Sequence, residues 1–145
     1  MLDALSMGYE VFGFGSILDK VAERLELDVS LLHRVTNPEY GIEDFIGGIP
    51  PDYQEEIAKG KNAYHEFDLR RELAWQSPDG IRESITNLIK SLDENPNIYE
   101  DVGVDPDPYG MYFLSGRFRK ELKQLLKIIS WADDNGIPRL RLIWI

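Results

Sequence analysis

Apolar residues recur at intervals of three and four positions in three segments of the chain, which is the pattern of amphipathic helices. The segments follow Ser16, Ser77 and Ser115, and serine is a favoured residue at a helix N-terminus. An Asn-Pro or Asn-Gly pair then ends the second and the third segment. The sequence therefore predicts helices over residues 17–25, 78–94 and 116–134. Their apolar stripes are Ile17, Leu18, Val21, Ala22 and Leu25; Ile81, Ile85, Leu88, Ile89 and Leu92; and Phe118, Leu122, Leu125, Leu126, Ile129 and Ala132.

A strand is predicted at the C-terminal end of the sequence. Leu140, Leu142 and Trp144 alternate with other side chains, so Arg139–Ile145 has the two-residue period of a strand. A strand needs partners for its backbone groups, and the candidates are Gly8–Phe14 and Met111–Leu114. The predicted fold class is α+β: a helical majority packed on a small, mostly antiparallel sheet that includes the C-terminal strand. We expect residues 1–145 to form a single globular domain.

Three further segments have weaker patterns. Asp28 is positioned to cap a second short helix that continues to about Val35. Residues 62–76 fit either a helix or an alternating strand, and their many Glu, Leu, Arg and Ala residues favour the helix. Residues 95–110 are rich in proline and carboxylates, which predicts a stiff acidic loop.

Composition and charge exclude some kinds of site and argue against some kinds of partner. The 145 residues include 43% hydrophobic residues, enough for one core, and no Cys, which excludes disulfides and thiolate zinc sites. Residues 1–114 hold 9 Lys and Arg against 23 Asp and Glu, whereas residues 115–145 hold 7 against 3. A negative field repels nucleic acids and membrane surfaces and attracts basic proteins. Without a secretory signal or a long apolar run, the expected location is the cytoplasm.

The sequence contains no motif of high specificity for catalysis. His33 and His65 follow no metal-ligand spacing, although His65 stands beside Glu66 and leaves open an enzyme site assembled around it. The segment from Asp105 to Gly110 begins like a calcium loop, but Gly116 occupies the position of the essential glutamate. We therefore predict no catalytic residue, no metal and no cofactor, and we favour a protein that is not an enzyme.

One segment has a local similarity to a DNA-binding motif. Residues 21–37 read Val-Ala-Glu-Arg-Leu-Glu-Leu-Asp-Val-Ser-Leu-Leu-His-Arg-Val-Thr-Asn, with Ala, Leu, Val-Ser and Arg-Val at the offsets of a helix-turn-helix. The segment resembles a repressor-type helix-turn-helix, although Glu26 stands where that family usually has glycine. The resemblance implies a recognition helix that presents Ser30, Leu31, His33 and Arg34. A DNA-binding regulator that uses residues 17–37 is therefore the alternative function, with the negative charge against it.

The leading hypothesis is a small acidic module that neutralises or docks onto a basic protein partner, as an immunity protein or an inhibitor does. The acidic loop Asn95–Gly110 is the expected contact surface because it combines carboxylates with aromatic side chains. Its prolines restrict the free loop and so lower the entropy that binding would cost. The predicted contact residues are Tyr99, Glu100, Asp101, Asp105, Asp107 and Tyr109.

Overall fold

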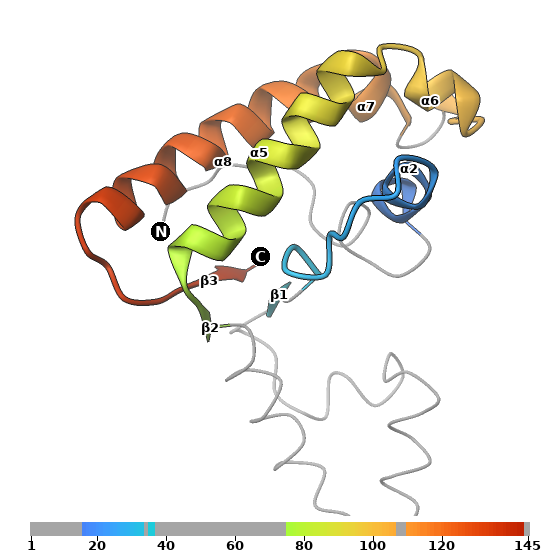
Figure 1. Ribbon diagram of the computed structural model, residues 1–145. Coiled ribbons are helices and arrows are strands. Elements are labelled where there is room, and N and C mark those ends of the chain that lie inside the picture. The colour runs from blue at the N-terminus through green and yellow to red at the C-terminus, as the bar shows by residue number, and fades with distance from the viewer. Residues whose placement is uncertain (1–15, 34, 37–74, 107–109, 144–145) are drawn as a thin grey trace, which may run out of the picture.

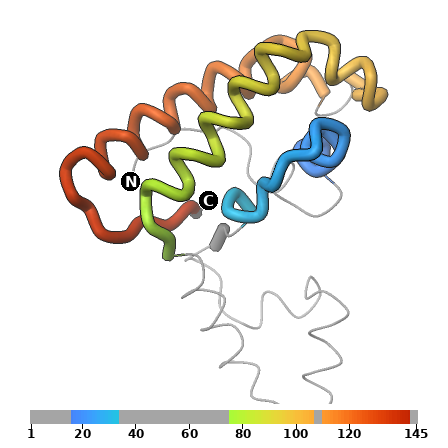
Figure 2. Tube along the Cα trace, viewed as in Figure 1, coloured from blue at the N-terminus to red at the C-terminus, as the bar shows by residue number. Residues whose placement is uncertain are grey.

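The computed structural model describes residues 16–33, 35–36, 75–106 and 110–143 (Figure 1). Within these ranges two long helices, α5 (Pro78–Glu94) and α8 (Arg117–Asp134), run side by side in opposite directions (Figures 1 and 2). The shorter elements are listed here in chain order: α2 (Ile17–Arg24), β1 (Val35–Thr36), β2 (Trp75–Gln76), α6 (Ile98–Asp101), α7 (Met111–Leu114) and β3 (Leu140–Ile143).

The helix pair buries the two apolar stripes that the sequence predicts. Ile81, Ile85 and Leu88 of α5 are fully buried, as is Leu122 of α8, and the rest of both stripes except Ala132 packs into one cluster with α2 and α7. Ion pairs join the helices at both ends. Arg82 Nη1 lies 3.1 Å from Asp133 Oδ2, and Arg119 pairs with Asp93 at the other end. The antiparallel pairing is therefore specified both by its apolar core and by its charges.

Among the described residues, three short strands form a sheet in the order β1-β3-β2. The strand β3 pairs in parallel with β1 and antiparallel with β2, with Trp75 opposite Arg141. Half-buried Leu140 and Leu142 of β3 pack against the core cluster. The predicted fold class, α+β with a small sheet that includes the C-terminal strand, is confirmed. The other candidate strand, Gly8–Phe14, lies outside the described residues.

The prediction of a strand at Met111–Leu114 is wrong, because these residues form helix α7. Neighbouring residues of a strand point to opposite faces, but Tyr112 and Phe113 are both buried. Met111 and Leu114, three positions apart, are both exposed, which is the spacing of one helical face. Two adjacent aromatic residues thus enter the same core, and only a helical turn permits this.

Three further predictions need correction. Asp28 accepts a hydrogen bond from the Ser30 backbone N–H (2.9 Å), but the helical turn that follows ends by residue 33. The predicted helix therefore does not reach Val35, which belongs to β1, where pairing with β3 satisfies the backbone. For residues 62–76 we favoured a helix, but Trp75 and Gln76 form a strand. Residues 62–74 lie outside the described ranges. The predicted loop at residues 95–110 contains α6.

Two of the three predicted capping serines, Ser16 and Ser77, stand at the N-cap position, but the prediction for Ser115 is wrong because Gly116 occupies that position in α8. Ser16 caps α2, its Oγ accepting a hydrogen bond from the Asp19 backbone N–H (3.3 Å). Ser77 precedes α5, and its hydroxyl donates to the Asp79 carboxylate, which lowers the pKa of that carboxyl. Gly116, with a φ of 80°, leads into α8 through a left-handed conformation that suits glycine.

A backbone prediction arises at the end of α2, where Glu26 has a φ of 55°. Glu26→Gly is expected to raise the free energy of unfolding by about 0.5–1 kcal/mol, because a left-handed conformation costs a residue with a Cβ more than it costs glycine. Urea denaturation of the two proteins measures the difference. The matched control is Glu23→Gly within α2, which should destabilise the protein by about 1 kcal/mol. A loss of stability in both variants would contradict the prediction.

Candidate functional site

The described part of the predicted acidic contact loop, residues 95–106 and 110, packs against the core through α6. Ile98 is buried at the start of α6, and the Val104 backbone N–H donates to the Tyr99 carbonyl oxygen (2.9 Å). Glu100 and Asp101 are exposed on α6, and Asp105 is exposed after it. Asp107 and Tyr109 lie outside the described residues. Three of the four predicted carboxylates are therefore exposed to solvent.

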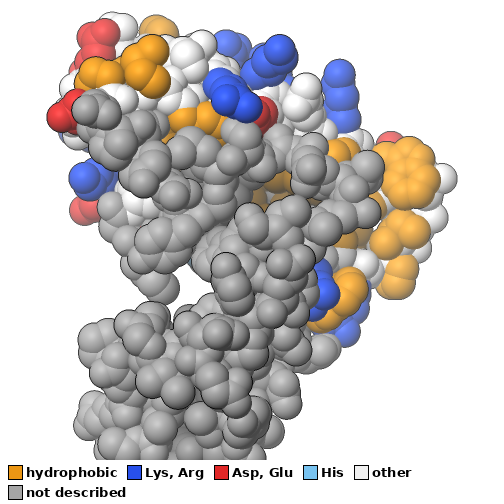
Figure 3. Space-filling model, turned by 180° about the vertical axis from the view of Figure 1, so that it is seen from behind, with side chains coloured by type: hydrophobic (Ala, Val, Ile, Leu, Met, Phe, Trp, Pro, Cys, Tyr) orange, Lys and Arg blue, Asp and Glu red, His pale blue; other side chains and the backbone are white. Residues whose placement is uncertain are grey.

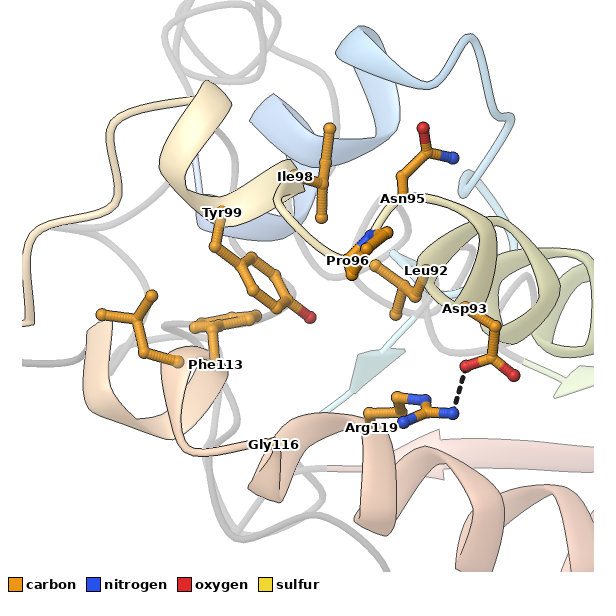
Figure 4. Close-up of a pocket in the computed structure, with 10 residues that line it drawn as sticks. Leu92, Asp93, Asn95, Pro96, Ile98, Tyr99, Phe113, Gly116 and Arg119 are labelled. Carbon is orange, nitrogen blue, oxygen red and sulfur yellow. Dashed lines mark ion pairs between the residues drawn. The ribbon is translucent and has the colours of Figure 1, made fainter.

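A hollow of about 230 Å³ lies beside α6, where the C-terminal end of α5 meets the N-terminal end of α8 (Figure 4). Its walls are mainly apolar, with the Asp93–Arg119 ion pair at one side. The arrangement suits a guest with an apolar group rather than a small polar molecule. The lining residues are Leu92, Asp93, Asn95, Pro96, Ile98, Tyr99, Phe113, Leu114, Gly116 and Arg119.

Packed aromatic rings form the wall of this hollow. The ring of Tyr99 lies 5.6 Å from that of Phe113, which in turn lies 4.8 Å from that of Phe118. Tyr112 completes the group, and its hydroxyl donates to Glu121 Oε2 (2.6 Å). Tilted contacts at these distances are the favourable geometry for aromatic pairs. The wall is therefore closely packed, and a guest would contact aromatic side chains.

Exposed apolar side chains extend the hollow onto the surface of α7. Met111 is 55% exposed and Leu114 38% exposed, and Leu114 also lines the hollow. The surrounding surface carries exposed carboxylates from the end of α5, from α6 and from the segment after it. We call this surface the acidic edge and define it as the hollow with Met111, Leu114, Asp93, Glu94, Glu100, Asp101 and Asp105.

The structure changes the role expected for Tyr99. We predicted it as a surface anchor among carboxylates, but its ring is a half-buried wall of the hollow. The exposed apolar groups beside the carboxylates are instead Met111 and Leu114, which the sequence interpretation assigned to a strand. These two residues are three positions apart, and that spacing in the sequence would have indicated a helix with both side chains on one face.

Burial raises the pKa of Tyr99 to about 12, and the nearby Arg119 cation opposes part of that shift. The folded state therefore holds the phenol proton more tightly than the unfolded state does. The protonated Tyr99 phenol makes its full contribution to the free energy of unfolding below pH 10. This contribution should be lost as the pH rises from about 10 to 12. Denaturant unfolding across this range should show a smaller decline for Tyr99→Phe than for the unmodified protein. Equal declines in both proteins would contradict the prediction.

The alternative sites gain no support from the described part of the chain. His33 Nε2 contacts Asp19 Oδ1 at 2.5 Å, and the Leu31 carbonyl oxygen accepts from Gln76 Nε2 (2.9 Å), so both residues face the protein. After α2 these residues form one turn and then β1, which does not provide the recognition helix of a helix-turn-helix. His65 lies outside the described residues.

Metal and membrane sites were also sought in the described ranges. No group of three or more His, Asp or Glu residues in them is placed to hold a metal ion. No helix there is both long and apolar enough to cross a membrane.

Comparisons with known proteins give no family assignment. No protein-family model matches the sequence, and neither the search of curated proteins nor that of solved structures returned a match. The function must therefore be argued from the acidic edge itself.

Proposed function

We propose that this protein is an acidic binding module that docks onto a basic protein partner through the acidic edge. The observation that supports the proposal is the juxtaposition of an apolar hollow, two exposed apolar side chains of α7 and a border of carboxylates. Apolar centres with a polar rim are the usual anatomy of protein interfaces. The proposed partner presents an apolar anchor flanked by Lys or Arg, as the target of an inhibitor or immunity protein would.

The two parts of the acidic edge are expected to contribute differently to binding. Burying one large apolar side chain of the partner stabilises the complex by about 1.5–3 kcal/mol, whereas an exposed ion pair contributes about 0–1 kcal/mol. The hollow and α7 therefore determine most of the affinity. The carboxylates act mainly on the association rate and on its dependence on salt.

A peptide titration followed by nuclear magnetic resonance tests the proposal. The probe is a short synthetic peptide in which lysines flank a single phenylalanine. The amide resonances of α6, α7 and the last turn of α5 should shift together as the peptide is added. The proposal fails if the shifts are spread over all exposed carboxylates, or if a peptide without the phenylalanine produces the same shifts at the same concentration.

Charge variants distinguish the effect of the acidic edge on peptide binding from the effect of the overall negative charge. Glu100→Gln with Asp101→Asn should slow association of the peptide and weaken its salt dependence. The matched control is Glu23→Gln with Glu83→Gln, which removes the same charge from exposed positions on α2 and α5. If both double variants slow association equally, the general field of the protein accounts for binding and the acidic edge has no special role.

A further inference from the structure

The outer face of α8 carries a second surface of opposite charge. Lys120, Lys123 and Lys127 are exposed on the face opposite the buried Phe118 and Leu122. None of the three lysine side chains forms an ion pair or hydrogen bond with the part of the chain that the structure describes. Their ammonium groups are therefore available to an external anion.

Trp131 continues the same face one turn after Lys127. It is 61% exposed, the largest exposed fraction among the large hydrophobic side chains described. Figure 3 shows Lys and Arg side chains along the upper part of this view, with apolar side chains at both ends. We define the basic stripe as Lys120, Lys123, Lys127 and Trp131. An exposed aromatic beside unpaired cations is typical of an interaction surface.

We propose that the basic stripe of one copy docks onto the acidic edge of a second copy of this chain. The argument is complementarity between two surfaces of the same molecule. One presents cations and an exposed indole, and the other presents carboxylates around an apolar hollow. The inference rests on the proposed function because the acidic edge is the receiving surface in both.

The geometry determines what kind of assembly results. The hollow lies at the N-terminal end of α8, whereas Trp131 lies near its C-terminal end (Figures 1 and 4). A contact between two different surfaces is head-to-tail, so an open assembly retains an unused basic stripe at one end and an unused acidic edge at the other. The assembly therefore grows beyond a dimer with concentration unless it closes into a ring.

Net charge limits the strength of this contact. Each copy carries −10 overall, so two copies repel one another at long range. At an ionic strength of about 0.15 M the Debye length is about 8 Å, and contacts between the local surfaces then outweigh the distant charges. We expect association near this ionic strength and much less of it at about 0.5 M, where the ion pairs themselves are screened.

Sedimentation velocity with two neutralised variants tests the proposal. The stripe variant is Lys120→Gln, Lys123→Gln, Lys127→Gln and Trp131→Gln; the edge variant is Glu100→Gln, Asp101→Asn and Leu114→Ser. The unmodified protein should form species larger than a dimer as its concentration rises. Each variant alone should remain monomeric. An equimolar mixture should form a complex of one copy of each and nothing larger, because only one complementary pair of surfaces is intact.

The outcomes are distinct. The proposal is overturned if the unmodified protein is monomeric throughout, if either variant associates as the unmodified protein does, or if the mixture stays monomeric. The stripe variant should still bind the lysine–phenylalanine peptide, since its acidic edge is unchanged. If the unmodified protein and the stripe variant bind the peptide but the unmodified protein does not self-associate, this inference is rejected and the proposed function stands. If neither protein binds the peptide at the acidic edge, the proposed function is rejected.

Discussion

Phe113→Ala is expected to lower the free energy of unfolding by about 3–5 kcal/mol, the usual cost of removing a fully buried aromatic side chain. Phe113 is 1% exposed, and its ring contacts the rings of Tyr99, Tyr112 and Phe118. Its loss would leave a cavity between α6, α7 and α8 that few neighbours can fill. Chemical denaturation monitored by circular dichroism measures the change.

The neighbouring residue supplies the control for this prediction. Leu114 belongs to the same short helix but is 38% exposed, so Leu114→Ala should cost less than half as much as Phe113→Ala. Similar losses for the two variants would show that α7 does not anchor the core through Phe113.

Deletion of residues 139–145 is expected to destabilise the protein by at least about 3 kcal/mol, from the lost burial of Leu140 and Leu142 and from the lost backbone hydrogen bonds. The central position of β3 explains the size of the effect. Both β1 and β2 lose their partner at once, because they pair with β3 and not with each other. Thermal unfolding of the shortened chain provides the measurement.

A single substitution in β3 is the control for the deletion, because it removes side-chain contacts of the strand and leaves its backbone hydrogen bonds in place. The Arg141 guanidinium lies 5.1 Å from the centre of the Trp75 ring. Arg141→Ala should therefore cost only about 0.5–1 kcal/mol, the range of an exposed cation–π contact. An unchanged melting temperature in the deletion variant would mean that β3 is dispensable, contrary to its place in the sheet.

The long elements could be predicted from the sequence because their signals are local and repeated. The stripe from Ile81 to Leu92 has five apolar residues at helical spacing and a serine–proline start, and helix α5 follows it closely. The short elements could not be predicted in this way. Val35 and Trp75 become strand residues because they pair with β3. This partner is distant in the sequence, so the local pattern around each residue does not indicate a strand.

The sequence indicates only some parts of the candidate site. The carboxylates Glu100 and Asp101 are visible in it, and both are exposed on α6. The hollow itself depends on how α5, α6, α7 and α8 meet, which is a property of the tertiary structure. The exposure of Trp131, by contrast, follows from the helical pattern, because this residue lies outside the predicted apolar stripe from Phe118 to Ala132.

The sheet order has a consequence for the sequence of folding events. The helices α5 and α8 are nearer to each other in the chain than β1 and β3 are, so their contacts close smaller loops and should form earlier. Pairing β1 with β3 instead closes a loop that contains most of the chain, at a larger cost in entropy. The helical hairpin should therefore gain protection from hydrogen exchange before the sheet does. During that interval β1 and β2 would both lack their partner, and the chain would be most prone to aggregate through these unpaired backbone groups.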